Sequence, residues 1–124
     1  MKIKSILLLA FIFTMFFCFG QQNNNWHFGY RACINFSTGV PINVPGSLLY
    51  ANEGSSSISD LSGNTLFYTD GIKVWNKNNV QMSNGFGLFG GEPTLNSSSQ
   101  SCIIIKQPGN TTMYYIFTDL EHRI

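Results

Sequence analysis

A repeat of about 50 residues constrains the fold of this chain more than any other feature. Each copy consists of a serine-containing segment, a Gly-Asn pair and an aromatic segment that ends in Thr-Asp. The parts of the two copies are, in order, 55–59, Gly63-Asn64 and Thr69-Asp70, then 99–103, Gly109-Asn110 and Thr118-Asp119. The offset is 46 residues at the Gly-Asn pairs and 49 at the Thr-Asp pairs. Such a period is typical of propeller blades rather than of helical solenoids.

Each copy of the repeat is predicted to form a β-hairpin, because glycine adopts without strain the positive φ that a tight turn needs. After the first hairpin, Gly71–Asn76 predicts a third strand that buries Trp75, and the glycine-rich segment Asn84–Gly91 fits a crossing to the next blade. We therefore predict an all-β fold over residues 26–124, namely an incomplete β-propeller of about one and a half blades. A small β-sandwich with two similar hairpins is the alternative.

The composition also favours short strands over long helices. Of the 104 residues from Gln21 onward, 11 are Gly, 4 Pro, 13 Asn and 12 Ser, which are residue types that form turns. Apolar residues occur in short groups between them, and each group predicts a strand. The groups are Trp26–Tyr30, Leu48–Tyr50, Leu66–Tyr68, Cys102–Ile105 and Met113–Phe117. The 13 aromatic residues suffice for a packed domain, and only Gln21–Asn25 is predicted to be a flexible leader.

Residues 1–20 have the pattern of a signal peptide. Two lysines precede the apolar segment Ile6–Phe19, and Cys18 and Gly20 place small side chains where signal peptidase acts. Cleavage between Gly20 and Gln21 is expected, which predicts a secreted or cell-surface protein. The apolar segment is shorter than the roughly 20 residues of a membrane-spanning helix. Lipidation of Cys18 is disfavoured, because the bulky Phe17 precedes it.

The charge excludes several classes of partner. The chain has a formal net charge of +1, and loss of the two amino-terminal lysines leaves five Lys/Arg against six Asp/Glu. No basic face then remains for nucleic acid. The acidic residues do not form a block that would attract cations. No stable membrane span is expected after cleavage.

Several motifs after the signal segment occur together in one kind of protein. They are Trp26-His27-Phe28-Gly29, Ile34-Asn35-Phe36, Glu53-Gly54-Ser55, Ile58-Ser59-Asp60, Gly63-Asn64-Thr65-Leu66-Phe67-Tyr68-Thr69-Asp70-Gly71, Val74-Trp75-Asn76, Met82-Ser83-Asn84-Gly85 and Tyr114-Tyr115-Ile116-Phe117-Thr118. Together they resemble the amino-terminal region of large secreted proteins of Bacteroidota.

That resemblance implies the start of a β-propeller, often followed by PKD-type immunoglobulin-like domains and a sorting domain of the type IX secretion system. It also implies an adhesion-like role and a fragment that ends at Ile124 within the second blade. No catalytic residues are assigned to this region of the family, so none is carried over. The chain departs from the family at Cys33 and Cys102, where small aliphatic residues are more usual.

Candidate catalytic and metal-binding residues are few. The only histidines are His27 and His122, and no cysteine or carboxylate lies at a metal-ligand spacing from either, so neither a metal nor a cofactor is predicted. Asp60, Asp70 and Asp119 follow or bound strands, where aspartate commonly caps a turn. A catalytic carboxylate pair is therefore not predicted.

Cys33 and Cys102 are the cysteines that remain after cleavage. An even pair in an oxidising compartment is compatible with a disulfide. The alternative is two separate buried thiols, since cysteine is among the most buried residue types. A bridge needs Cα atoms within about 7 Å of each other, which a sequence does not reveal.

Two functions from different classes follow. The first is a non-catalytic part of a secreted or cell-surface propeller protein, structural or adhesive. Its loops, such as Asn76–Asn84 and Gly85–Asn96, would contact polysaccharide or another surface protein. The alternative is the amino-terminal part of a secreted propeller glycoside hydrolase whose catalytic residues lie beyond Ile124. We expect the first, and no enzymatic activity in this region.

Overall fold

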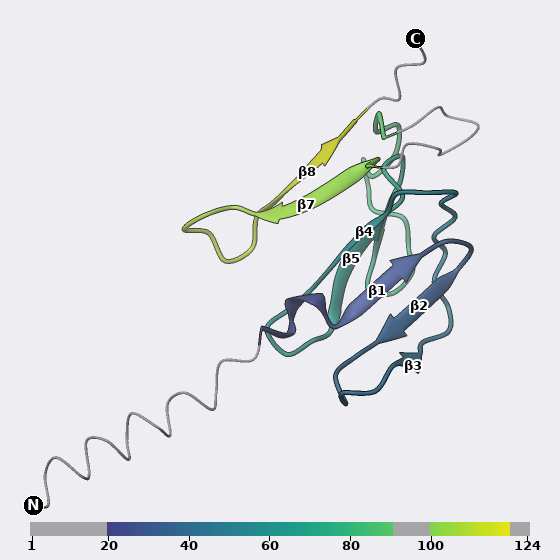
Figure 1. Cartoon of the computed structure of the whole chain (residues 1–124). Helices are drawn as coiled ribbons and strands as arrows, with labels where there is room; N and C mark the ends of the chain where they lie inside the picture. The colour runs from purple at the N-terminus through teal and green to yellow at the C-terminus, as the bar shows by residue number, and fades with distance from the viewer. Residues whose placement is uncertain (1–19, 91–99, 120–124) are drawn as a thin grey trace, which may run out of the picture.

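The computed structural model describes residues 20–90 and 100–119, which form three small antiparallel β-sheets and almost no helix (Figure 1). The elements are the 3-10 turn η1 (Gln21–Asn23) and the strands β1 (Asn25–Phe28), β2 (Ala32–Asn35), β3 (Ile42–Asn43), β4 (Ser56–Ser59), β5 (Thr65–Thr69), β6 (Val74–Asn76), β7 (Cys102–Lys106) and β8 (Tyr114–Thr118). The predicted all-β class is therefore confirmed. The predicted signal segment up to Phe19 lies outside the described residues, as does His122.

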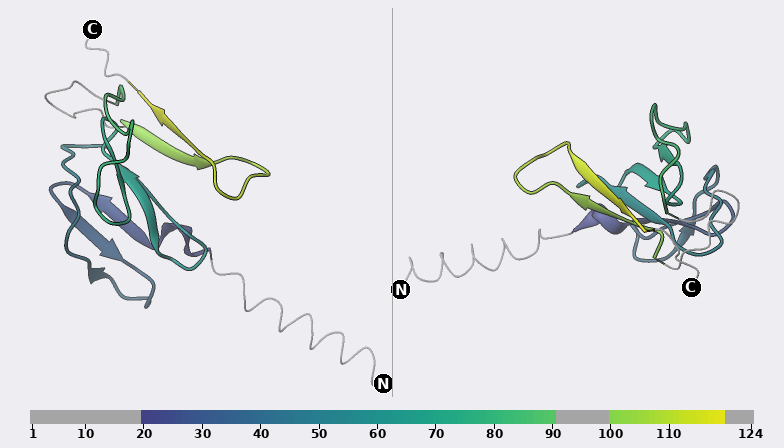
Figure 2. Two further views of the ribbon diagram at one scale, coloured as in Figure 1. Left: turned by 180° about the vertical axis from the view of Figure 1, so that it is seen from behind. Right: turned by 90° about the horizontal axis from the view of Figure 1, so that it is seen from above.

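Each sheet consists of strands that follow one another in the chain. The first sheet has the order β1-β2-β3, the middle sheet β4-β5-β6, and β7 and β8 form a hairpin. All neighbouring strands are antiparallel. The first strands of the three units are neighbours, because β4 contacts both β1 and β7. The middle sheet thus lies between the first sheet and the hairpin (Figure 2).

The middle sheet is covered on both faces. Successive side chains of a strand point to opposite faces, and β5 follows this rule. Tyr68 stacks on His27 of the first sheet with ring centroids 3.9 Å apart, whereas Phe67 meets Tyr114 of the hairpin edge-on at 5.4 Å. The third strand of this sheet is shorter than the predicted Gly71–Asn76, because the first half of that segment forms the connection from β5.

Asp and Asn side chains hold the turns. Four of them each accept hydrogen bonds from two backbone N–H groups that lie two to four residues further along: Asp60, Asp70, Asn76 and Asn110. Such bonds stabilise turns locally. The turn glycines of the repeat behave as predicted, with φ values of 83° at Gly63 and 73° at Gly109.

The β7–β8 hairpin repeats the strand order of the first copy but not its faces. In the aligned copies Phe117 takes the place of Tyr68, and Ile116 takes the place of Phe67. Tyr68 is fully buried against the first sheet, whereas Phe117 is 55% exposed. Ile116 lines a cavity together with Phe67 of the middle sheet. In the middle sheet, the face with Phe67 points toward the following unit, which is the hairpin. In the hairpin, the face with the aligned residue Ile116 points back toward the middle sheet.

The first sheet contains more strands than predicted. The sequence predicts one strand here, at Trp26–Tyr30, and the structure adds β2 and β3, so three sheets replace the expected one and a half blades. Asn25, the last residue of the predicted flexible leader, is the first residue of β1 and is buried. The strands therefore begin inside that segment.

The segment Leu48–Tyr50 is not a strand, and that prediction is wrong. It lies along the turn between β1 and β2, where the Arg31 N–H donates to the Leu49 carbonyl at 2.8 Å and Tyr50 forms an isolated bridge with Tyr30. A turn offers too few backbone groups to continue the pairing. The segment instead places Leu49 in the core, where this side chain is fully buried.

The hydrophobic core lies between the first and middle sheets and is small. Leu49, Ala51, Tyr68 and Trp75 form its cluster of buried side chains. Tyr68 is the largest fully buried residue, and its ring stacks on Trp75 with centroids 5.5 Å apart. Aromatic stacking across adjacent strands therefore supplies much of the packing.

A close approach of two glycines joins the β5–β6 connection to the chain after β6. The Gly90 N–H donates to the Gly71 carbonyl at 2.9 Å. A Cβ atom at position 90 would lie 2.5 Å from the Gly71 Cα and 2.6 Å from the Ser101 carbonyl oxygen. Because both neighbours are backbone atoms, they cannot rotate away. Only glycine fits at position 90.

We expect Gly90→Ala to lower the free energy of unfolding by about 3 kcal/mol, the upper part of the range for overpacking. Gly87→Ala is the control: its φ of 69° strains alanine, but nothing lies within 4 Å of the added Cβ. That strain alone costs about 1 kcal/mol. Urea unfolding measures both variants, and equal losses would contradict the close approach.

Candidate functional site

His27 is surrounded by side chains from several parts of the fold. Its Nδ1 lies 3.0 Å from the Ser47 hydroxyl, and its Nε2 lies 3.4 Å from the Cys33 thiol and 3.5 Å from the Thr65 hydroxyl. The ring is nearly parallel to that of Tyr68, with an interplanar angle of 9°. β1, β2, β5 and the connection before β4 thus meet at this imidazole.

Burial keeps the His27 imidazole and the Cys33 thiol uncharged. Burial lowers the pKa of His27 to about 4 and raises the pKa of Cys33. His27 is 7% exposed and Cys33 is 1% exposed. A catalytic Cys-His pair needs a thiolate and access for a substrate. Both pKa shifts oppose an ion pair, and neither group is open to solvent, so this contact is structural.

The two cysteines lie in different sheets and are free thiols. Cys33 is in β2, whereas Cys102 is in β7 and has its Sγ 3.8 Å from the Thr69 carbonyl oxygen. Burial raises the pKa of the Cys102 thiol. Of the two alternatives that the sequence leaves open, the structure contains the separate thiols.

Asp60 and Asp70 are used in turns, and none of the cavities described below is lined by two aspartates. Asp60 and Asp70 lie at opposite ends of the five-residue strand β5. That strand is about 17 Å long, and glycosidase carboxylates lie about 5–9.5 Å apart. Hydrogen bonds from Asn64 hold the pKa of Asp60 below its usual value. Asp70 is 3% exposed, whereas Asp119 is exposed and lines a cavity without a second carboxylate.

One of the two loops predicted to contact partners is tied to the middle sheet. In Asn76–Asn84 the Met82 N–H donates to the Val74 carbonyl at 2.9 Å, so this loop runs back along β6. The second loop, Gly85–Asn96, is described only in its first half, where Phe86 is 62% exposed.

A cavity of about 350 Å³ lies where β1 meets β4, and we call it the β1–β4 cavity. Serine hydroxyls connect the two strands there: Ser55 Oγ donates to the His27 carbonyl at 2.9 Å, and Ser57 Oγ donates to the Asn25 carbonyl at 2.7 Å. The other lining residues are Asn23, Trp26, Phe28 and Ser56. The lining therefore combines aromatic rings with neutral polar groups.

Two further cavities lie beside the hairpin. One of about 510 Å³ separates the hairpin from the middle sheet and is lined mainly by apolar side chains, among them Val74 and Ile116. The other, of about 590 Å³, lies between β4 and the hairpin and includes Asp119. It shares Ser55 and Ser56 with the β1–β4 cavity, so these two cavities adjoin across β4.

The residues of 20–90 and 100–119 contain no group of three or more His, Cys, Asp or Glu side chains that could hold a metal ion. Within these same ranges, no helix is long and apolar enough to cross a membrane.

No family model matches the sequence, and comparison with curated proteins and with solved structures finds no match either. The resemblance to secreted Bacteroidota proteins therefore stays a prediction. The functional argument depends on the fold and contacts of the described residues.

Sequence reasoning identifies His27 but not the residues around it. Nothing in the pattern pairs Ser47 with His27, because the two meet only through the fold. The sequence does contain a signal for the two serines that face β1. Ser55 and Ser57 are two residues apart in an extended segment, so both hydroxyls point to the same side.

We expect the free energy of unfolding to fall as the pH decreases from about 6.5 to about 4. The folded protein keeps His27 neutral until the pH nears 4, whereas the unfolded imidazole binds its proton near pH 6.5. The unfolded state binds more protons between these two pH values. The free energy of unfolding is therefore highest above pH 6.5 and falls as the pH decreases to about 4. Because each pKa unit corresponds to about 1.4 kcal/mol, the expected loss is about 3 kcal/mol.

His27→Phe is the matched variant, because it keeps a ring on Tyr68 and removes the titrating nitrogens. Its unfolding free energy, measured by urea denaturation at several pH values, should be flatter between pH 6.5 and 4 than that of the wild type. An unchanged slope in the variant would assign the pH dependence to other groups.

Proposed function

We propose that this chain is a non-catalytic structural and binding module of a secreted or cell-surface protein, and that its three sheets are successive blades of a β-propeller. Propeller blades are small antiparallel sheets arranged around a common axis. The neighbouring first strands β1, β4 and β7 support this arrangement, and three layers are one more than a sandwich has. The reversed faces of the hairpin depart from a simple rotation between sheets, and the units have three, three and two strands where a propeller blade has four.

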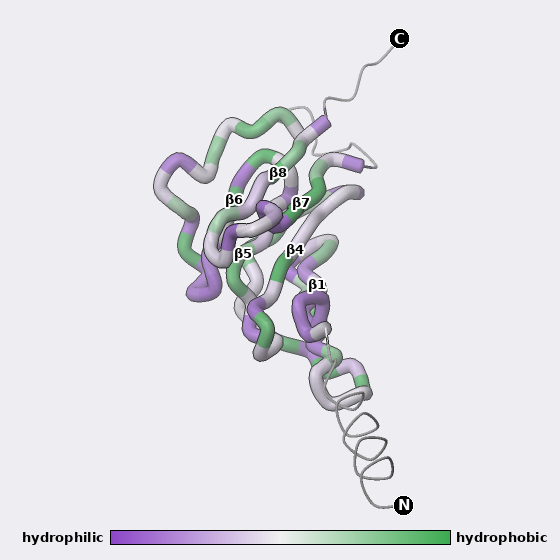
Figure 3. The backbone as a smooth tube through the Cα atoms, turned by 90° about the vertical axis from the view of Figure 1, so that its left-hand side faces the viewer, coloured by the Kyte–Doolittle hydropathy of each residue, from purple (hydrophilic) through white to green (hydrophobic). Residues whose placement is uncertain are grey.

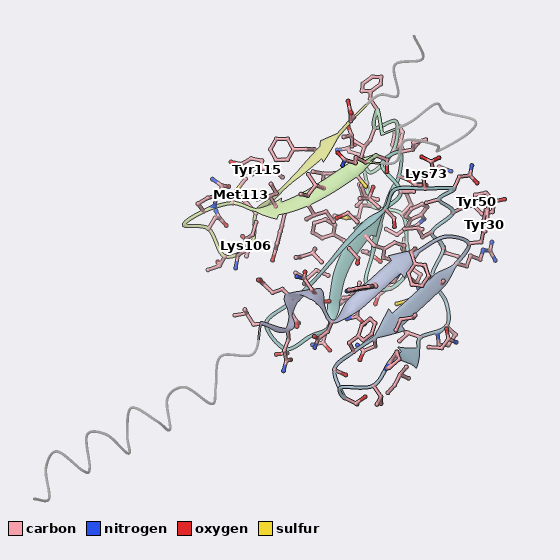
Figure 4. The ribbon with its side chains drawn as sticks, viewed as in Figure 1. Tyr30, Tyr50, Lys73, Lys106, Met113 and Tyr115 are labelled. Carbon is pink, nitrogen blue, oxygen red and sulfur yellow. The ribbon has the colours of Figure 1, made fainter. Side chains whose placement is uncertain are left out.

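The outer face of the β7–β8 hairpin is the observation that carries the proposal. Ile103 pairs with Phe117 and Ile105 with Tyr115, and all four side chains are 44–55% exposed. Figure 3 shows the hydrophobic character of β7, and Figure 4 shows Tyr115 on the hairpin at a distance from the first sheet. A contiguous apolar patch on a sheet marks a contact surface. We propose that a further sheet of the same kind covers the part of this face formed by Ile105 and Tyr115, since Ile103 and Phe117 also line the cavity beside β4.

The non-catalytic character is supported by the use of the reactive side chains. Asp60 and Asp70 serve as acceptors for backbone N–H groups in turns. His27 and Cys33 contact each other inside the packed region between the sheets. These residues stabilise the fold, which leaves surfaces and cavities as the parts of the described chain that can meet a partner.

Export follows from the charged and apolar pattern of the first twenty residues. We expect a chain that begins at Gln21 outside the cytoplasm. Amino-terminal sequencing of the secreted material measures this directly. Recovery of the intact amino terminus in a membrane fraction would show an anchor instead.

The covering sheet is tested through the hairpin face. The full exported chain should self-associate and melt over a broad range, because Ile105 and Tyr115 are exposed. The double variant Ile105→Lys, Tyr115→Lys should associate less while its circular dichroism spectrum stays unchanged. Sedimentation velocity measures association, and differential scanning calorimetry measures the width of the melt.

Ile104→Lys is the control, since Ile104 lies on the other face of the same strand and is half-buried. This variant should lose stability rather than association. A sharp, reversible two-state melt of the monomeric wild-type chain would contradict the proposal and would favour a small self-sufficient sandwich.

A further inference from the structure

We infer that the β1–β4 cavity binds a neutral carbohydrate chain and that Trp26 is the ring on which a sugar stacks. The inference deepens the proposed function, because it rests on the chain being a binding module. A sugar ring has C–H groups on its faces and hydroxyls around its edge. It is therefore recognised by a flat aromatic surface combined with neutral hydrogen-bonding groups.

Trp26 provides an aromatic surface that is exposed and held in place. Its side chain is 55% exposed. The indole Nε1–H donates to the Asn23 carbonyl at 2.9 Å, and the ring packs on Phe36 with centroids 5.0 Å apart. A ring fixed before binding loses little conformational entropy when a ligand stacks on it. Phe28, at 39% exposure, adds a second aromatic side chain to the same lining.

The serines of β4 and the residue before it provide the polar groups. Ser55 and Ser57 donate their hydroxyl protons to carbonyls of β1, and their oxygens can still accept hydrogen bonds from a ligand. The Ser56 hydroxyl makes no hydrogen bond to any other described residue. Asn23 and Asn25 complete a lining without a charged side chain. Neutral hydroxyl groups match such a lining better than carboxylates or phosphates, which favour charged donors.

The size of the site indicates an oligosaccharide. A volume of about 350 Å³ is within the range of small-molecule sites. The adjoining cavity of about 590 Å³ continues across Ser55 and Ser56. A ligand longer than a disaccharide can therefore contact both cavities and should bind more tightly than a short one.

An extended peptide fits this place less well. Peptides that join a sheet use the free backbone groups of an edge strand. At the edge of β1 that faces β4, the carbonyls of Asn25 and His27 already accept the serine hydroxyls. The carbonyl groups that a peptide would need are thus occupied.

The fluorescence of the full exported chain gives a direct test. The chain has two tryptophans, and Trp75 is 6% exposed, so quenching by acrylamide reports mainly on Trp26. The probes are unbranched oligosaccharides of glucose, xylose or N-acetylglucosamine, as disaccharides and hexasaccharides, with hexagalacturonate as the acidic counterpart. At least one neutral hexasaccharide should protect Trp26 from quenching, more strongly than its disaccharide and more strongly than hexagalacturonate.

Calorimetric titration of variants locates the site. Trp26→Ala should weaken binding about tenfold or more, as loss of a central aromatic contact does. Ser56→Ala should weaken it about threefold to tenfold through one lost hydrogen bond, and it keeps the test valid if Trp26→Ala fails to fold. Phe86→Ala removes an aromatic side chain that is 62% exposed and lines neither cavity, so binding should stay unchanged.

Several outcomes would overturn the inference. They are the absence of binding to every neutral probe, equal affinity of the wild type and both cavity variants, or displacement of the sugar by an extended peptide without side-chain preference. A chain that self-associates through its hairpin but binds no sugar would overturn this inference alone. The proposed structural role would stand in that case, because it depends on the hairpin face.

Discussion

The ring of Tyr68 lies between His27 of the first sheet and Trp75 of its own sheet, and no part of its side chain reaches solvent. Its hydroxyl accepts a hydrogen bond from the Leu48 N–H at 3.0 Å and donates one to Asn79 Oδ1 at 2.8 Å. One side chain therefore fixes two sheets, the connection before β4 and the turn after β6. Truncation of such a buried aromatic residue costs about 3–5 kcal/mol, a large part of the stability of a small domain.

The middle sheet can approach the first sheet closely because β4 brings small side chains to it. Ser57 and the preceding Ser55 place their hydroxyls on the carbonyls of β1, so polar groups meet where aliphatic side chains would hold the strands apart. Asn25 adds bonds from its amide to the Ser59 hydroxyl at 2.9 Å and to the Gly63 carbonyl at 2.6 Å. Buried polar groups are stable when they are paired in this way. The serine-rich sequence of the repeat thus has a packing role.

The hairpins, the turn glycines and the strand at Val74–Asn76 are predictable from sequence, because each depends on residues close together in the chain. The strands β2 and β3 are not predicted. In the case of β3, the two residues Ile42–Asn43 are too few to show a pattern. The faces of the hairpin are not predictable either. The Thr-Asp offset of 49 exceeds the Gly-Asn offset of 46 by an odd number of residues, and an odd insertion changes the face of a strand relative to its turn. The contacts around His27 arise only from the assembled sheets.

The chain has few charged side chains, and the edge of β1 and the outer face of the β7–β8 hairpin differ in how they are protected without them. Natural sheets commonly protect an edge or face with charged side chains. The edge of β1 is protected by serine hydroxyls instead, whereas the outer face of the hairpin has four apolar side chains in two adjacent pairs. Lys106, at the end of β7, pairs with Tyr114 on the opposite face and does not interrupt this patch. Covering the hairpin would therefore remove apolar area from water without burying a charge, which favours the packing of another sheet on this face.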